Sequence, residues 1–85
     1  MALSLNNLAK LYQAQGAYAA AEPLFKRTLA IYEKALRPEH PSLAGALENY
    51  ATLMRETGRN AEAEELRVRA RAIWVMYGAA NAAYR

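Results

Sequence analysis

The 85-residue sequence contains no cysteine, only four glycines and three prolines, and a single histidine. The absence of cysteine excludes a disulfide framework, a thiolate zinc site and a cysteine nucleophile, although it leaves the redox compartment open. The sequence also lacks an apolar run of about 18 residues and the basic segment of a secretory signal. We therefore predict a cytoplasmic protein that does not associate with membranes.

The residue groupings of an enzyme site are missing as well. No glycine-rich phosphate loop, catalytic carboxylate pair or cluster of metal ligands occurs in the sequence. His40, the only histidine, lies between Glu39 and Pro41 with no nucleophile paired to it, so we interpret it as a structural loop residue. The sequence predicts no enzymatic activity, no cofactor and no metal site.

The net charge of +3 is spread over both halves of the chain, so neither half is a basic arm. Between residues 62 and 71 the glutamates come first and the arginines follow, which complements a helix dipole. At helical spacing Arg69 points away from Arg67 and Arg71, and no aromatic residue is interleaved for stacking on bases. We interpret this segment as a solvated helix face and predict no nucleic-acid partner.

What the chain does contain is an internal repeat. The stretch from Leu5 to Tyr12 returns in altered form from Leu47 to Met54, at an offset of 42 residues. At the same offset Gly16 corresponds to Gly58. Self-similarity at such a period signals a helical array.

Two such units fill almost the whole chain, so we predict a single domain over residues 1–85. The first unit spans residues 2–43 and the second spans residues 44–77, while residues 78–85 form a C-terminal cap or extension. A chain of this length buries only about 60% of the surface that its unfolded form exposes, so we expect a thin core.

Apolar residues recur at helical spacing through both units, which predicts an all-α fold. In the first unit we expect helices over about residues 2–15 and 18–36, separated by Gly16 and packed as a hairpin. The small residue Ala9 lies at the centre of the first apolar stripe and allows the second helix to approach closely. Residues 37–41 contain two prolines and form the linker between the units.

In the second unit we expect Ser42 to cap the third helix and Gly58 to end it. The fourth helix begins near residue 60. Around residues 73–77 the apolar residues no longer keep to one face, and residues 78–85 stand where a linker is expected. The repeat pattern therefore lapses toward the C-terminus.

The first unit carries large and small residues at a distinctive spacing: Leu5, Leu8, Ala9 and Tyr12, followed by Ala21-Glu22-Pro23-Leu24-Phe25. This pattern resembles the tetratricopeptide repeat, and the 42-residue period is most similar to the longer repeat of kinesin light chains. The resemblance implies four helices in two hairpins, stacked as a short right-handed α-solenoid, with a possible short C-terminal helix or helix extension. It also implies a partner that is a protein or a peptide.

In this family the first helix of each unit lines a concave groove that receives an extended or helical peptide. The resemblance therefore implies a non-enzymatic interaction scaffold. Helical-wheel positions give these candidate peptide-binding residues: Asn6, Asn7, Lys10, Gln13, Glu48, Asn49, Thr52 and Arg55. Asn7 and Asn49 are the sharpest candidates, because an amide offers both a donor and an acceptor to a peptide backbone. The alternative is that both asparagines bond to a neighbouring helix or face water.

Neither end of the chain has an obvious polar cap, although terminal units of helical arrays normally carry one. The candidates for self-association at the two ends are Leu11, Ile73, Trp74, Met76 and Tyr77. Either residues 79–84 fold back as a short fifth helix, or another chain covers these side chains. We favour a homo-oligomer, with a twofold dimer ahead of head-to-tail stacking. The alternative function is thus a self-associating assembly module, whether natural, engineered or cut from a longer array.

Overall fold

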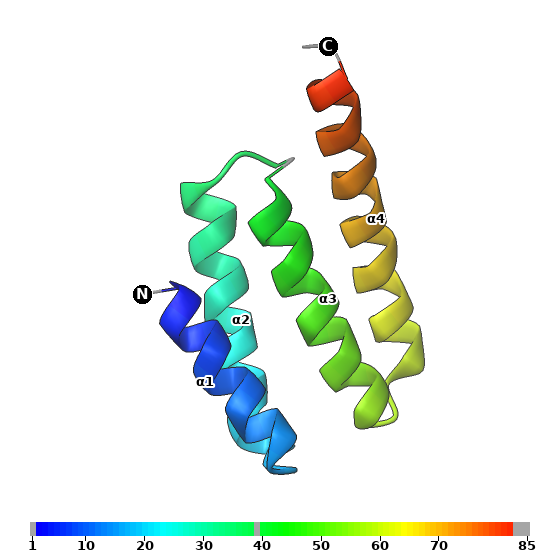
Figure 1. The fold of residues 1–85 in the computed structure, drawn as a ribbon. Coiled ribbons are helices and arrows are strands. Elements are labelled where there is room, and N and C mark those ends of the chain that lie inside the picture. Colours follow the sequence, from blue (N-terminus) through cyan, green and yellow to red (C-terminus); the bar gives the residue numbers. More distant parts are fainter. Residues whose placement is uncertain (1, 39, 83–85) are drawn as a thin grey trace.

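The computed structural model describes residues 2–38 and 40–82, which contain four α-helices and no strand. The helices are α1 (Ala2–Ala14), α2 (Tyr18–Ala35), α3 (Pro41–Glu56) and α4 (Asn60–Ala82). They form two antiparallel hairpins, α1 with α2 and α3 with α4, and α3 packs against α2 so that the hairpins stack side by side (Figure 1). The predicted all-α fold of two helical hairpins is confirmed.

Each hairpin turns at a glycine whose φ is positive. The φ angle is +79° at Gly16 and +81° at Gly58, a left-handed conformation that strains other residues but not glycine. The residue after each glycine donates its backbone N–H to a carbonyl in the last turn of the preceding helix, over 2.8 Å in both hairpins. These bonds satisfy carbonyls that a helix end leaves unpaired. Both glycines therefore end their helices as predicted.

The start of α3 differs from the prediction. His40 rather than Ser42 is the N-cap, and its Nδ1 atom accepts a hydrogen bond from the Ser42 backbone N–H over 3.1 Å. Pro41 occupies the first helical position, where its fixed φ favours the helix and its missing N–H costs nothing. The helix therefore begins inside the segment that we assigned to the linker, and His40 has a structural role there.

At the end of α4 the structure shows a helix extension, one of the two alternatives given for the C-terminus. This helix has 23 residues and continues through Gly78, and over the described residues no separate helix folds back. It continues because residues 79–82 are alanines and one asparagine, whereas prolines follow the end of α2. Its C-terminal end projects past the loop between α2 and α3 (Figure 1). Among the described residues, neither α4 nor any shorter helix combines the length and apolarity needed to span a membrane.

The core lies within and between the two hairpins. Ala9 and Ala21 are fully buried where α1 meets α2, so small side chains bring these helices close together. Between the hairpins the Phe25 ring stacks on the Tyr50 ring, with the ring centroids 6.2 Å apart. Aromatic burial of this kind contributes a large share of the hydrophobic stabilisation in a small core. The hairpins are thus fixed relative to each other by packing as well as by the polar contacts described next.

Candidate functional site

The first helices of the two hairpins, α1 and α3, are joined by two side-chain contacts. Asn49 Nδ2 donates to Asn6 Oδ1 over 3.4 Å, and Gln13 Nε2 donates to Glu56 Oε1. Together these helices form one surface, which we call the first-helix face. Its members are Asn6, Asn7, Lys10, Gln13, Glu48, Asn49, Thr52 and Arg55. The structure thus brings the candidate peptide-binding residues of both units onto neighbouring helices.

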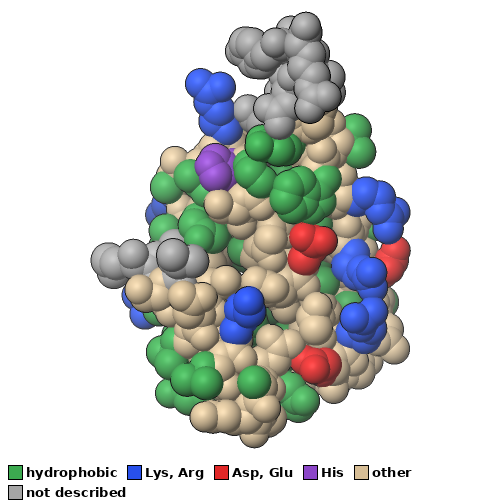
Figure 2. Space-filling view, viewed as in Figure 1, with side chains coloured by type: hydrophobic (Ala, Val, Ile, Leu, Met, Phe, Trp, Pro, Cys, Tyr) green, Lys and Arg blue, Asp and Glu red, His purple; other side chains and the backbone are tan. Residues whose placement is uncertain are grey.

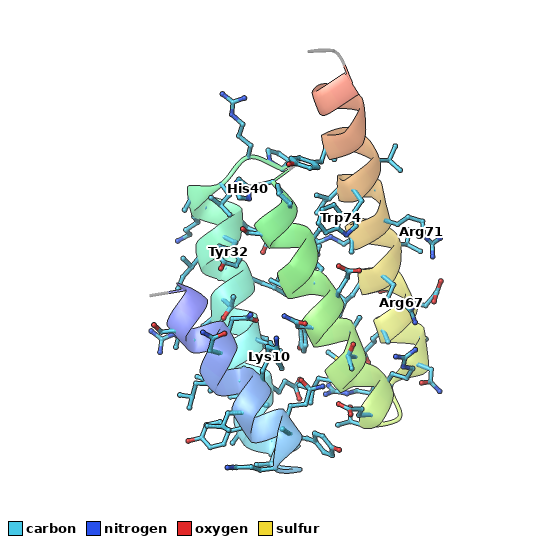
Figure 3. The ribbon with its side chains drawn as sticks, in the orientation of Figure 1. Lys10, Tyr32, His40, Arg67, Arg71 and Trp74 are labelled. Atoms are coloured by element: carbon cyan, nitrogen blue, oxygen red, sulfur yellow. The ribbon has the colours of Figure 1, made fainter. Side chains whose placement is uncertain are left out.

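The members of the first-helix face differ in exposure. Asn6, Gln13 and Asn49, which take part in the contacts between the helices, are half-buried, and the other five members are exposed. The Thr52 hydroxyl already donates to the backbone carbonyl of Glu48 over 3.0 Å. Lys10 lies on the side of α1 that faces α3 (Figure 3). The exposed groups therefore flank the amide contacts on both helices.

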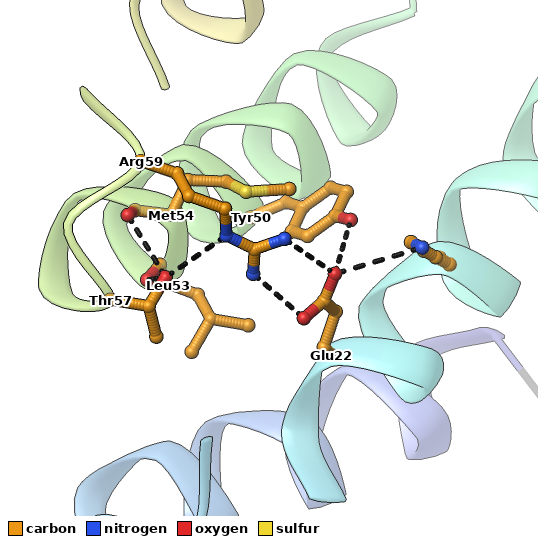
Figure 4. A network of polar contacts seen from close by, with 7 residues as sticks. Glu22, Tyr50, Leu53, Met54, Thr57 and Arg59 are labelled. Atoms are coloured by element: carbon orange, nitrogen blue, oxygen red, sulfur yellow. Dashed lines mark hydrogen bonds and ion pairs between the residues drawn. The ribbon is translucent and has the colours of Figure 1, made fainter. Parts of the chain in front are cut away.

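A bidentate ion pair joins the hairpins on another side. The Arg59 guanidinium donates to both carboxylate oxygens of Glu22, over 2.7 and 3.0 Å, and the Tyr50 hydroxyl donates to the same carboxylate over 3.3 Å (Figure 4). The repeat pattern does not reveal this pair. Its signal is weak, because Arg59 stands where the first unit has Ala17, and only the stacking of the units brings it to Glu22. The ion pair joins α2 to the turn between α3 and α4.

The network shifts three pKa values. The hydrogen bonds from Arg59 lower the pKa of Glu22 against the opposing effect of partial burial, and the same bonds raise the pKa of Arg59. Burial, followed by the negative charge of Glu22, raises the pKa of Tyr50 to about 12. At neutral pH the carboxylate is therefore charged and the phenol neutral. These protonation states suit a structural clamp rather than proton transfer.

Two stacked hairpins of similar sequence can be compared with known repeat families. The family model described as Tetratricopeptide repeat matches residues 1–83. The chain belongs to the tetratricopeptide repeat family. Tetratricopeptide repeats are typically non-enzymatic protein-interaction modules, so the chain is in general terms a protein-interaction scaffold. Among curated proteins, none matches the chain.

The N-terminal end of this tetratricopeptide repeat pair is apolar. Leu8 and Leu11 are 40% and 54% exposed, and we call the surface that they form the N-terminal face. At the equivalent positions of the second repeat, Tyr50 and Leu53 are 6% and 0% exposed, because the first hairpin covers them. The N-terminal face is therefore the equivalent, in the first repeat, of the surface of α3 that is buried against the first hairpin.

The opposite end of the repeat pair is charged. In the first repeat, one surface packs against α3. The residues 42 positions after those of that surface form what we call the C-terminal face: Glu48, Arg55, Glu64, Arg67, Arg71 and Trp74. Basic side chains gather over α4 in Figure 2. Glu48, Arg67, Arg71 and Trp74 line a pocket of about 170 Å³. No aromatic residue is interleaved among these arginines in the sequence, but Trp74, from the next turn of α4, lines the pocket beside them (Figure 3).

The residues predicted for self-association do not form one group. Leu11 is exposed on the N-terminal face, and Trp74, Met76 and Tyr77 are exposed on α4. Ile73 differs from the prediction, because it is 5% exposed and belongs to the buried core. It was assigned to an open surface because the sequence alone did not reveal that this side of α4 packs against α3.

A cleft beside Ile73 is likewise not evident from the sequence. It has a volume of about 380 Å³ and lies between α4, the end of α2 and the loop that follows α2. Leu36, Leu43 and Met76 supply apolar walls, and the ion pair between Arg69 and Glu33, 3.1 Å long, lies at its edge. The cleft includes no member of the first-helix face.

Proposed function

We propose that the chain is a scaffold that binds a peptide segment of a partner protein along the first-helix face. The observation that carries the proposal is the pair of contacts between α1 and α3, Asn6 with Asn49 and Gln13 with Glu56. These contacts hold the two helices in register, so that the exposed polar groups of both are presented together. A peptide that binds such a preorganised surface loses less free energy in ordering its receptor.

The amides of this face suit a peptide backbone. The contact between Asn49 and Asn6 uses one N–H group of Asn49, so the pair retains further donors and acceptors. Asn7 is exposed, and its side chain forms no hydrogen bond within residues 4–38 and 40–78. A peptide backbone alternates N–H and C=O groups, which amides can bind whatever the peptide's side chains are. This chemistry supports recognition of an extended segment.

A selected peptide tests the proposal. Selection of a random peptide library against the intact chain supplies the ligand, and calorimetry measures its affinity. Substituting Asn7→Ala and Asn49→Ala together should weaken binding roughly tenfold, since each hydrogen bond contributes about 0.5–1.5 kcal/mol. Asn60→Ala is the matched control, because Asn60 is exposed at the start of α4 and lies off the first-helix face. Unchanged affinity in the double variant, with its circular dichroism spectrum preserved, would contradict peptide binding at this face.

A second candidate function is self-association through the N-terminal face. The observation that favours it is the exposure of Leu8 and Leu11, whose equivalents in the second repeat are covered by the first hairpin. A twofold contact would bury these leucines in a closed dimer without open growth. Trp74 is less suited to a twofold contact, because Arg67 and Arg71 beside it would face like charges.

Absolute mass, measured by light scattering after gel filtration over a wide range of concentration, tests the second candidate. We expect a dimer that Leu11→Glu returns to a monomer. Trp74→Glu, which places the same charge at the opposite end, should leave the dimer intact. A monomer at every concentration would exclude self-association and leave the peptide-binding scaffold.

A further inference from the structure

The interface between the two hairpins shows how a helix docks on a repeat of this chain, and the C-terminal face has the equivalent positions. In that interface α3 docks on the first hairpin with the Tyr50 ring on Phe25, and Leu29 lies in the same buried core. Polar contacts surround this centre: Asn49 with Asn6, Glu56 with Gln13, and Arg59 with Glu22. Each residue of the first hairpin named here has an equivalent in the second hairpin, 42 positions later.

On the C-terminal face the positions of this docking surface recur, but their chemistry is changed. Phe25 and Leu29 are replaced by Arg67 and Arg71, and both arginines are exposed. Gln13 is replaced by Arg55, which is also exposed. Three neutral positions of the first hairpin thus become positively charged in the second.

Over the part of the chain that the structure describes, these arginines form no ion pair. Within residues 4–38 and 40–78, Arg59 and Arg69 form ion pairs, whereas Arg55, Arg67 and Arg71 form none. The nearby Glu48 carboxylate accepts a hydrogen bond from Trp74 Nε1 over 3.2 Å, which holds the indole beside the arginines. Exposed guanidinium groups next to a tryptophan favour a ligand that carries both carboxylates and apolar surface.

We propose that the C-terminal face docks an acidic amphipathic helix of a partner protein, in the orientation that α3 takes on the first hairpin. At the position of Tyr50 such a helix carries a carboxylate, which pairs with Arg67. At the position of Glu56 it keeps its carboxylate, which then meets Arg55 instead of Gln13. Glu64, the equivalent of Glu22, still accepts a basic residue at the position of Arg59. This surface is distinct from the first-helix face, although both include Glu48 and Arg55.

A second copy of the chain does not fit this surface. In head-to-tail stacking its Leu8 would lie at the position of Tyr50, its Ala14 at that of Glu56 and its Ala17 at that of Arg59. None of these side chains can pair with Arg55, Arg67 or Glu64. Their charges would be desolvated without compensation, which is costly. A second copy is therefore not the occupant, and open growth by stacking of copies is disfavoured.

The sequence of α3 supplies the probe for this proposal. The peptides are residues 41–59 in three forms: unchanged, with Tyr50→Glu, and with Thr52→Glu. The two acidic peptides have equal net charge, but only Tyr50→Glu places the carboxylate on the docking side, because Tyr50 is buried in the interface and Thr52 is exposed. Trp74 is the only tryptophan of the chain and is absent from the peptides, so its fluorescence reports binding at the C-terminal face.

We expect the Tyr50→Glu peptide to bind roughly tenfold more tightly than either of the other two, which corresponds to one new charge-assisted hydrogen bond. Added salt should reduce this preference. In the chain, Arg67→Gln should abolish the preference, while Arg27→Gln, which removes an exposed arginine of α2 off this face, should leave it unchanged. Combining Arg67→Phe with Arg71→Leu restores the surface of the first hairpin and should make the unchanged peptide the preferred ligand.

Equal affinity for the two acidic peptides would overturn the proposal, because it would show attraction by net charge alone. So would binding of no peptide, or a rise in mass without peptide that Arg67→Gln suppresses, since a second copy would then be the occupant. Circular dichroism of each variant confirms that the fold is retained. The pair Asn7→Ala and Asn49→Ala should not change the preference, so this test and that of the first-helix face can fail separately.

Discussion

The two ends of the molecule each expose one side of an interface that, between the two hairpins, is buried. The N-terminal face repeats the surface that α3 presents to the first hairpin, and it keeps apolar residues, Leu8 and Leu11, although they are exposed. The C-terminal face repeats the surface that the first hairpin presents to α3, but it carries Arg67 and Arg71 at the positions of Phe25 and Leu29. The repeat pattern thus specifies where helices can stack, while the side chains of each copy decide what stacks there.

The largest expected effect compares Phe25 with its equivalent, Arg67. Phe25→Ala should destabilise the chain by about 3–5 kcal/mol, because it removes a ring that is fully buried against Tyr50. Arg67→Ala should change the free energy of unfolding by less than about 0.5 kcal/mol, since Arg67 is exposed. Urea unfolding followed by circular dichroism measures both changes. Similar losses in the two variants would mean that the C-terminal face is covered in solution.

A second prediction uses the Tyr50 hydroxyl, which the interface buries beside Glu22. The pKa of Tyr50 is raised from 10.0 to about 12 in the folded chain, so its contribution to stability is complete below pH 10 and is lost as the pH rises through 12. This contribution is on the order of 2 kcal/mol. Tyr50→Phe should remove this part of the pH dependence.

Urea unfolding at a series of pH values from neutral to strongly alkaline checks the second prediction. At neutral pH the difference in free energy of unfolding between Tyr50→Phe and the unchanged chain gives the cost of losing the hydrogen bond. At alkaline pH the difference in how steeply that free energy falls with pH gives the effect of Tyr50 ionisation. A variant that loses stability as steeply as the unchanged chain would show that Tyr50 ionises without penalty, and hence that the hairpins open at this point.

The sequence predicted the parts of the fold that depend on local chemistry. The turns at Gly16 and Gly58 follow from backbone conformation, and the burial of Ala9 follows from the spacing of apolar residues. The cap of α3 was missed because a histidine after a proline-containing turn is a less common cap than the nearby Ser42, which only supplies the N–H group.

The features that sequence reasoning missed depend on contacts between distant residues. The pairing of Arg59 with Glu22 has no counterpart within either repeat, and it exists only once the hairpins are stacked. For Asn49 the structure shows the alternative given above, a bond to a neighbouring helix, but the sequence did not identify its partner as Asn6. A repeat pattern identifies equivalent positions, but it does not state which of them meet across the interface.

A third prediction compares two glycines of the second repeat. Gly58→Ala should destabilise the chain by about 1–2 kcal/mol, because φ is +81° there. Gly78→Ala should instead stabilise it by about 0.5 kcal/mol, since Gly78 lies inside α4 and an added Cβ meets no atom within 4 Å. Thermal unfolding measures both effects. Destabilisation by Gly78→Ala would indicate that α4 bends at this residue in solution rather than continuing as one helix.

The smallest expected effect compares Glu22 with its equivalent, Glu64. Because Arg59 lowers the pKa of Glu22 below its ordinary value of 4.5, this carboxylate contributes stability above pH 4.5 that is lost as the pH falls through the lower, folded-state pKa. Glu22→Gln should therefore cost at most about 1 kcal/mol at neutral pH and flatten the loss of stability on the acid side. Glu64 is exposed and has no ion pair among the described residues, so Glu64→Gln should change neither the stability at neutral pH nor its loss at acid pH. Thermal unfolding at neutral and acid pH distinguishes the two variants. An equal effect of both would mean that the ion pair of Glu22 with Arg59 adds no stability beyond that of a free carboxylate, so that core packing and the remaining polar contacts hold the repeats together.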